Sequence, residues 1–383
     1  MKRILISLFS CFLVLTSFAA EPAQVLSELK ARNAPDKRTA VWDVSVASQN
    51  GSTVILGTVG TTEQRMVIDN AMRINNITDY ENRVVVLEQT LPENQRWALV
   101  KLAVASLRTE PKHSAEMATQ GIMGMPLRVI ERCGDWLRVQ MPDKYIAYVP
   151  ESSVSLFDSK SLESWRDSKR YIVTAYSSEL VALPGSDITM SDLVLGCILQ
   201  FVSEKDGWVC LAAPDGRLGW VEKKDVAEFY RWAQQPQDVD LIEKTARRML
   251  GSGYLWGGTS TKVTDCSGLM KVCYFANAII LQRDASQQAL TGVKVADWHQ
   301  AERGDLLFFG NSQTGRVTHV GMYLADGKYI HCSGQVKINS LDPEASNYLY
   351  SPLSISRILG NVGSSGITPV KYHPWYFTPR IDR

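Results

Sequence analysis

The stretch Thr264-Asp265-Cys266-Ser267-Gly268-Leu269-Met270 joins a loop rich in glycine and threonine to an apolar segment, Asp265 to Ile279, that we predict to be helical. A cysteine in the first turn of a helix faces unpaired backbone N–H groups and the positive end of the helix dipole. Both favour the thiolate, which is the nucleophilic form of the side chain, and the same N–H groups can donate to an oxyanion. Cys266 is therefore a candidate nucleophile, whereas we expect Cys273, further along the helix, to be a buried structural residue.

A cysteine nucleophile needs a base, and the base needs an orienting group. Two of the chain's five histidines lie on neighbouring predicted strands, His319 in Val317 to Leu324 and His331 in Lys328 to Cys332, with Asp326-Gly327 as the turn between them. Neighbouring antiparallel strands can hold two side chains next to each other. We therefore predict that these two histidines supply the base and its orienting group, although either histidine taken alone could be a structural or surface residue.

The same region contains residues that could form a metal site instead, namely Cys266, Cys273, His319, His331 and Cys332. Zinc sites use paired spacings such as C-x₂-C or H-x₃-H, which are lacking here. We predict neither a metal nor another cofactor.

The last part of the chain has helical segments first and strands afterwards. Leu241 to Leu250 has helical spacing and ends at Gly251-Ser252-Gly253, and the predicted helix with Cys266 follows it. Leu306 to Phe309 begins the run of predicted strands. Helices followed by an antiparallel sheet make an α+β fold.

An internal repeat precedes this region. Trp136 and Pro142-Asp143 recur, 72 residues later and without a gap, as Trp208 and Pro214-Asp215. Each copy has the pattern of a strand, a Pro-Asp turn and a second strand, so the repeat predicts two small β-barrels. The tryptophans are expected to pack in their cores. Residues 21–100 are expected to form a small α+β region, with Asn50-Gly51 as a hairpin turn.

Residues 1–20 have the pattern of a secretory signal peptide: Lys2 and Arg3, an apolar stretch from Ile4 to Phe18, then Ala19-Ala20. A retained membrane anchor and a lipid-attached Cys11 are the alternatives. We expect an exported protein, periplasmic or extracellular, with no membrane span after signal removal.

Composition narrows the function further. The net charge of +1, from 41 basic and 40 acidic residues, argues against a nucleic-acid partner. The six cysteines beyond residue 20 are scattered in a large chain and imply no disulfide framework. We expect a monomer.

Several ordered motifs resemble those of the NlpC-type cell-wall cysteine peptidases, which have a papain-like fold. They are Y-x-W-G-G at 254–258, D-C-S-G at 265–268, R-D-A-S at 283–286, G-D-L-L-F-F at 304–309, H-V-G-M-Y at 319–323 and I-H-C-S-G at 330–334. The upstream repeats resemble bacterial SH3-like domains. By these resemblances the chain has SH3-like barrels at 101–158 and 168–229 and a peptidase domain at 236–383, after the signal peptide predicted at 1–20 and the small α+β region predicted at 21–100.

The resemblance implies Cys266 as nucleophile, His319 as general base, His331 as the third member and Tyr254 as an oxyanion ligand. The architecture is similar to that of γ-D-glutamyl-L-diamino acid endopeptidases, which act on peptidoglycan-derived peptides with a free amino-terminal L-Ala. Their amine-binding and pocket residues map to positions in this chain, with Glu116 as a rival to Glu110. The mapped residues are Asp265, Ser267, Glu110, Tyr145, Arg283, Asp284 and Trp256.

The chain departs from this family pattern at Ala285, where a serine is common, at Lys144, where the turn usually has glycine, and at Tyr148, where the second repeat has tryptophan. These differences concern fine specificity. Two other functions remain open: an amidase or D,L-endopeptidase that acts on intact wall, and a non-catalytic scaffold that binds wall through its SH3-like domains.

Overall fold

The computed structural model describes residues 21–378. The predicted signal peptide, residues 1–20, lies outside the described residues. The described chain divides into two compact units. We call residues 21–35 and 41–86 the N-terminal unit, and residues 36–40 and 87–378 the main unit.

The N-terminal unit is a small α+β fold. The hairpin of β1 (Trp42–Gln49) and β2 (Ser52–Val59) turns at Asn50 and Gly51, whose φ angles of 52° and 83° are the left-handed conformation that such tight turns require. The remaining elements are α1 (Pro22–Asn33), α2 (Thr62–Ile74), β3 (Tyr80–Asn82) and β4 (Val85–Val86). Both β3 and β4 run parallel to β2. The predicted hairpin at Asn50-Gly51 is thus confirmed.

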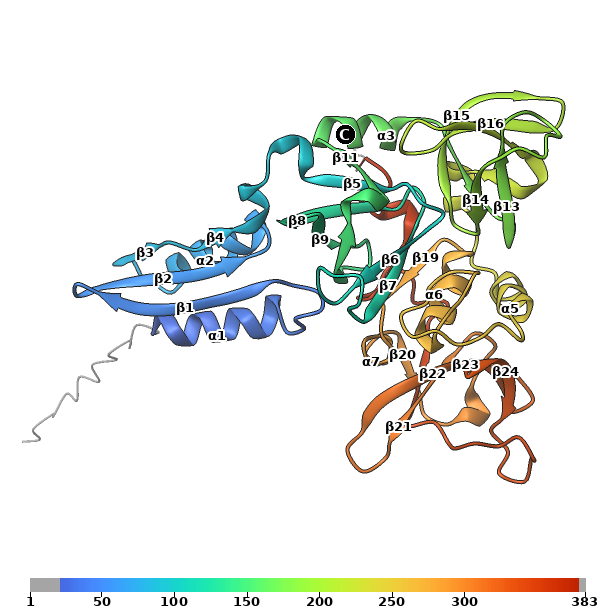
Figure 1. Cartoon of the computed structure of the whole chain (residues 1–383). Coiled ribbons are helices and arrows are strands. Elements are labelled where there is room, and N and C mark those ends of the chain that lie inside the picture. Colours follow the sequence, from blue (N-terminus) through green and yellow to red (C-terminus); the bar gives the residue numbers. More distant parts are fainter. Residues whose placement is uncertain (1–20, 379–383) are drawn as a thin grey trace, which may run out of the picture. The chain divides into compact units, whose positions relative to one another are not determined.

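The main unit begins with two antiparallel sheets of seven strands (Figure 1). We call residues 97–157 the first β module and residues 170–228 the second. The first contains β5 (Trp97–Val100), β6 (Val104–Arg108), β7 (Met117–Ile122), β8 (Pro126–Cys133), β9 (Trp136–Gln140), β10 (Ile146–Pro150) and β11 (Val154–Phe157). The second contains β12 (Arg170–Val173), β13 (Ser177–Val181), β14 (Thr189–Val194), β15 (Ile198–Lys205), β16 (Trp208–Ala212), β17 (Leu218–Glu222) and β18 (Val226–Glu228).

The two β modules share one topology. The strand order is β7-β6-β10-β9-β8-β5-β11 in the first and β14-β13-β17-β16-β15-β12-β18 in the second, so corresponding strands occupy corresponding places. The repeated Pro-Asp turn joins β9 to β10 and β16 to β17. Strand β5 starts at Trp97, before the domain boundary that we predicted at residue 101. Helix α3 (Ser159–Asp167) connects the two modules.

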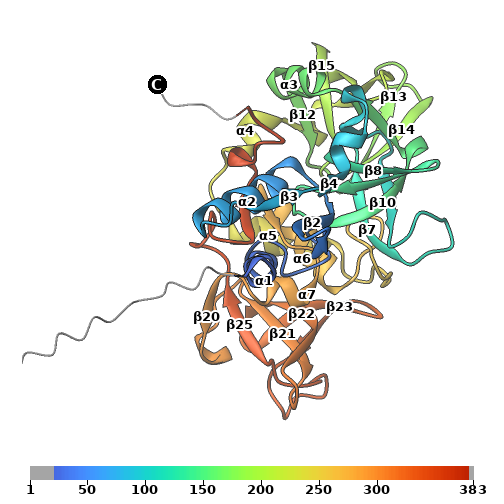
Figure 2. The same ribbon diagram turned by 90° about the vertical axis from the view of Figure 1, so that its left-hand side faces the viewer.

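The rest of the main unit packs helices on a six-stranded antiparallel sheet of order β20-β25-β21-β22-β23-β24. The strands are β20 (Val293–Val295), β21 (Leu306–Asn311), β22 (Arg316–Ala325), β23 (Lys328–Ser333), β24 (Gln335–Ser340) and β25 (Ser354–Arg357). Helices α4 (Phe229–Ala233), α5 (Val239–Arg248), α6 (Cys266–Phe275) and α7 (Ala285–Gln288) precede all six strands in the chain. Figures 1 and 2 both place α6 against this sheet, and buried apolar residues of α5, α6 and the sheet form one core. The predicted α+β fold is confirmed.

Helix α6 is shorter than predicted. It ends at Phe275, and Ala278 has a φ of 57°, which reverses the chain. Ile279–Leu281 then forms β19, which pairs with β26 (Ile367–Pro369). The prediction of a helix through Ile279 was wrong, because an apolar run fits a buried helix and a buried strand equally well. No helix within residues 21–378 is long and apolar enough to cross a membrane.

Candidate active site

Cys266 is the first residue of α6, and tight packing fixes the start of this helix. The Asp265 carboxylate caps the helix by accepting a hydrogen bond from the Gly268 N–H at 2.7 Å. A β-carbon at Gly268 would lie 1.9 Å from the carbonyl oxygen of Gly258, so only glycine lets the helix approach this loop so closely. The sulfur is consequently held in place, and Cys266 is only 7% exposed.

The electrostatic setting of Cys266 differs from the expected one. Burial raises the pKa of the Cys266 thiol to about 11, and the Asp265 carboxylate adds to this rise. The N–H groups of Val320 and Ser267 hydrogen-bond the sulfur and lower the thiol pKa, but they do not offset burial. Our expectation of a lowered proton affinity was therefore wrong for the substrate-free site, which holds the thiol protonated.

The two predicted histidines are in contact. His319 lies on β22 with Val320 next to it, and its Nε2 is 2.7 Å from Nδ1 of His331 on β23. Nε2 of His331, which is fully buried, is 2.8 Å from Oδ1 of Asn339 on β24. Asn339 in turn donates from Nδ2 to the carbonyl oxygen of Asn347. Three adjacent strands thus build one chain of hydrogen bonds.

This chain fixes which nitrogen of each ring carries a proton. Because Nδ2 of Asn339 donates to a carbonyl, Oδ1 of Asn339 must accept from Nε2 of His331. Nδ1 of His331 is then an acceptor, so Nε2 of His319 is its donor. Nδ1 of His319 is left without a proton and can act as the base. Burial and the neighbouring His331 lower the pKa of His319 to about 3, which keeps the ring neutral.

Two tyrosines lie near the sulfur. Burial and then Cys266 raise the pKa of the half-buried Tyr254, so its hydroxyl keeps its proton and can donate. Burial and Cys266 also raise the pKa of Tyr350, whose ring packs edge-on against Phe309 at 5.1 Å. Phe309 in turn lies 5.9 Å from the ring of His319. Trp256, in the loop after Tyr254, is 58% exposed.

Asp265 is engaged by neighbours that sequence reasoning did not connect. The Arg283 guanidinium, 2% exposed, pairs with the Asp265 carboxylate at 2.5 Å. It also donates to Ser267 Oγ at 3.0 Å and to the carbonyl oxygen of Ala118 at 3.1 Å. The Asp265 charge is thus balanced inside the protein, and Arg283 links α6 to β7 of the first β module.

The structure brings together some of the predicted amine-binding residues and separates others. Burial and then the nearby Asp284 carboxylate raise the pKa of the Tyr145 hydroxyl. Glu110 lies in the exposed hairpin between β6 and β7, where its carboxylate pairs with Lys112 at 2.7 Å. Among residues 21–378, neither Glu110 nor its rival Glu116, also exposed, makes a side-chain hydrogen bond or ion pair with Tyr145 or Asp265.

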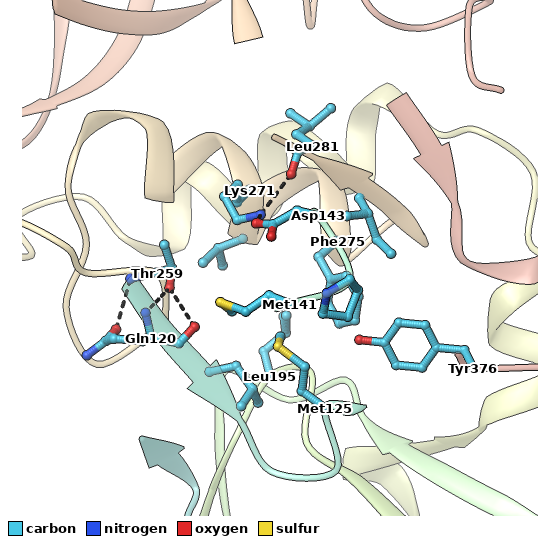
Figure 3. A pocket seen from close by; sticks show the side chains of 14 residues that line it. Gln120, Met125, Met141, Asp143, Leu195, Thr259, Lys271, Phe275, Leu281 and Tyr376 are labelled. Carbon is cyan, nitrogen blue, oxygen red and sulfur yellow. Dashed lines mark hydrogen bonds and ion pairs between the residues drawn. The ribbon is translucent and has the colours of Figure 1, made fainter. Parts of the chain in front are cut away.

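Buried polar contacts connect α6 and the loop before it to the first β module (Figure 3). Lys271 of α6 pairs with Asp143 at 2.6 Å, and Asp143 accepts a hydrogen bond from the N–H of Tyr145 at 2.9 Å. Gln120 of β7 and Thr259 exchange hydrogen bonds of 2.8 and 3.0 Å. A small cavity of about 60 Å³ lies between these contacts. These contacts therefore support the turn that presents Tyr145, and none of them includes Cys266, His319 or His331.

Asn339, Tyr350 and Arg38, which contacts Asp284, were missed from the sequence. The sequence offers one signal for Asn339: it stands eight positions after His331, beyond a Ser-Gly turn that makes a further strand conceivable. Within residues 21–378, no group of three or more His, Cys, Asp or Glu side chains is arranged to hold a metal ion.

A nucleophile at a helix start, facing a base on an adjacent antiparallel sheet, defines the papain-like class of cysteine peptidases. The family model described as NlpC/P60 family matches residues 251–352, and the model for the bacterial dipeptidyl-peptidase SH3 domain matches residues 107–154. The chain belongs to the NlpC/P60 family and is a cysteine peptidase that acts on cell-wall peptides.

Similar proteins support this assignment. Dipeptidyl-peptidase 6 of Lysinibacillus sphaericus is 28% identical over 66% of this chain and 94% of its own length. The γ-D-glutamyl-L-lysine dipeptidyl-peptidase of Bacillus cereus is 30% identical over 56% of this chain and 67% of its own length. The crystal structure of an NlpC/P60 family protein from Bacillus cereus aligns with a TM-score of 0.61 and 23% identity, covering 68% of this chain and 99% of that one, and shows a shared fold.

Proposed function

We propose that this protein is a cysteine endopeptidase that hydrolyses the bond between γ-D-Glu and the L-diamino acid in murein stem peptides with a free amino-terminal L-Ala. The observation that carries the proposal is the ordered hydrogen-bond chain that ends at His319, whose neighbour Val320 directs its backbone N–H to the Cys266 sulfur. The names of the similar dipeptidyl-peptidases support a cut two residues from the amino end.

The chemistry follows from the protonation states. In the substrate-free site both Cys266 and His319 are neutral, so the thiol proton passes to Nδ1 of His319 as the sulfur attacks the γ-carbonyl carbon. The Tyr254 hydroxyl and the backbone N–H groups at the start of α6 donate to the oxyanion. The imidazolium gives its proton to the leaving amine, and His319 then activates the water that hydrolyses the thioester.

We attribute the restriction to substrates with a short amino-terminal end to the first β module. Its strand β7 reaches the active-site residues through Ala118, which accepts from Arg283, and through Gln120, which bonds Thr259. Its Pro-Asp turn presents Tyr145 to Asp284. An ammonium group needs such a carboxylate when it leaves water. We assign Tyr145, Asp284 and the region of Glu110 to this amino-end subsite.

We further propose that the protein is exported as a monomer to the periplasm or the cell exterior, where peptidoglycan-derived peptides are found. The pattern of residues 1–20 and the wall-degrading relatives support this location. The proposed domains are the α+β region 21–100, two SH3-like domains at 101–158 and 168–229, and the peptidase domain 236–383.

Peptide hydrolysis by the purified full chain tests the proposal. We expect L-Ala-γ-D-Glu-meso-diaminopimelate to yield L-Ala-D-Glu and the free diamino acid, identified by mass, and the N-acetylated peptide to remain intact. Cys266→Ala should abolish cleavage of the free-amine peptide. Equal cleavage of an acetylated or glycan-linked stem would favour a D,L-endopeptidase or amidase on intact wall. No cleavage of any stem peptide would favour a non-catalytic binding protein.

A further inference from the structure

A short segment from the amino-terminal part of the chain belongs to the main unit. We call residues 36–40 the N-terminal strap. The carbonyl oxygen of Arg38 accepts a hydrogen bond from the N–H of Ile146 at 2.7 Å, and that of Thr39 accepts one from the Gln140 side chain at 2.8 Å. The strap therefore lies along β9 and β10, the strands that flank the turn with Tyr145.

Arg38 extends from the strap to the peptidase part of the unit. Its guanidinium pairs with the Asp284 carboxylate at 2.7 Å and donates to Ser286 Oγ at 3.2 Å. The Asp36 carboxylate holds the same guanidinium at 2.6 Å and accepts a hydrogen bond from Gln287 at 2.9 Å. Arg38 is about two thirds buried, so these pairs are partly shielded from solvent.

The Asp284 carboxylate, which pairs with Arg38, has two further partners. Asp284 caps α7 through a capping box with Gln287, and its carboxylate lies near the Tyr145 hydroxyl. Three separate parts of the chain therefore meet at one carboxylate: the strap, the turn of the first β module and the start of α7.

The charges in this cluster leave room for a cationic ligand. Asp265 is already neutralised by the buried Arg283. Arg283 also reaches Asp284, at 3.9 Å, and Arg38 pairs with both Asp284 and Asp36. The three carboxylates of Asp36, Asp265 and Asp284 thus share two guanidinium groups, so the cluster retains an excess of one carboxylate. An excess negative charge at this end of the site suits an ammonium group, and Arg38 determines where that charge is held.

We infer that Arg38 is a positioning residue of the amino-end subsite, which gives the N-terminal strap a part in substrate selection. The inference rests on the proposed function. Arg38 fixes Asp284 and, through it, the Tyr145 hydroxyl, in the geometry that binds the free amine of the substrate. Residues far upstream of the recognised domains would thus contribute to specificity.

The test compares Arg38→Gln and Arg38→Lys with wild type in the full chain, on L-Ala-γ-D-Glu-meso-diaminopimelate and on its N-acetylated form. We expect Arg38→Gln to raise KM for the free-amine peptide about tenfold while kcat changes less than about twofold, because a charge-assisted contact that positions the subsite is lost. Arg38→Lys should recover part of the loss. Arg83→Gln is the matched control, since it removes an exposed arginine pair with Glu81 in the N-terminal unit. It should leave both constants unchanged.

The outcomes separate the inference from the proposed function. An unchanged or lowered KM in Arg38→Gln, with wild type cutting the free-amine peptide selectively, would overturn the inference alone. An equal fall of kcat for all substrates together with a lower unfolding temperature would reduce Arg38 to a structural role and also overturn it. If Arg38→Gln does not fold, Asp36→Asn serves instead, because Asp36 orients Arg38, and a raised KM is again expected. Failure of wild type to cut the free-amine peptide would refute the proposed function.

Discussion

Replacing Asn339 with leucine, a side chain of similar size, tests the hydrogen-bond chain behind the active site. The substitution removes the acceptor that residues 21–378 provide for Nε2 of His331, a buried donor 2.8 Å from Asn339 Oδ1. A buried donor without a partner costs about 1–3 kcal/mol. His331 can escape this cost by moving its proton to Nδ1, and that tautomer no longer accepts from His319.

If the whole cost falls on the transition state, kcat/KM should drop on the order of 10- to 100-fold. The assay follows release of the diamino acid from the free-amine peptide by mass spectrometry. Asn347→Ala is the control, because Asn347 accepts the hydrogen bond from Asn339 with its backbone carbonyl, which alanine also has. An Asn339→Leu protein that is folded and retains more than half of wild-type kcat/KM would show that Asn339 does not support catalysis through His331.

Three further predictions follow from other contacts. Arg283→Met leaves the Asp265 carboxylate buried without its partner and should lower the free energy of unfolding by about 3–5 kcal/mol in urea titrations, with partial recovery when Asp265→Asn is added. No loss in the single variant would show that the pair is not structural. Lys144→Gly should raise the free energy of unfolding by about 1 kcal/mol, because Lys144 has a φ of 70° where Gly216 stands in the second β module; a lowered thermal midpoint would contradict this. The rate of Cys266 alkylation by iodoacetamide should still rise about tenfold per pH unit above pH 9. Burial raises the thiol pKa to about 11, and only the thiolate reacts. A plateau of the rate below pH 7 would instead indicate an ion pair with His319.

Local patterns in the sequence were sufficient for much of the fold. The hairpin at Asn50-Gly51, the strands with His319 and His331 and the start of α6 were all predicted, because turn residues and alternation act over a few positions. The end of α6 was not, because the chain reversal at Ala278 serves the pairing of β19 with β26, more than eighty residues apart.

The sequence predicted the site residues that lie in recognisable motifs and missed the contacts between distant residues. Asn339 was missed because its role depends on how three strands align across a sheet, and nothing next to it in the sequence indicates His331 as its partner. The pairing of Asp265 with Arg283 was missed because each was assigned to substrate separately. The thiol pKa was expected to fall because a helix start can be recognised in sequence, whereas the burial that outweighs it arises from packing.

Attack by the Cys266 sulfur can be tested directly by the intact mass of the protein after rapid acid quenching during turnover of the free-amine peptide. We predict a transient adduct equal to L-Ala-D-Glu less water, localised by peptide mapping to Cys266 and missing from Cys266→Ala. Product formation without such an adduct, or an adduct on another residue, would contradict attack by the Cys266 sulfur.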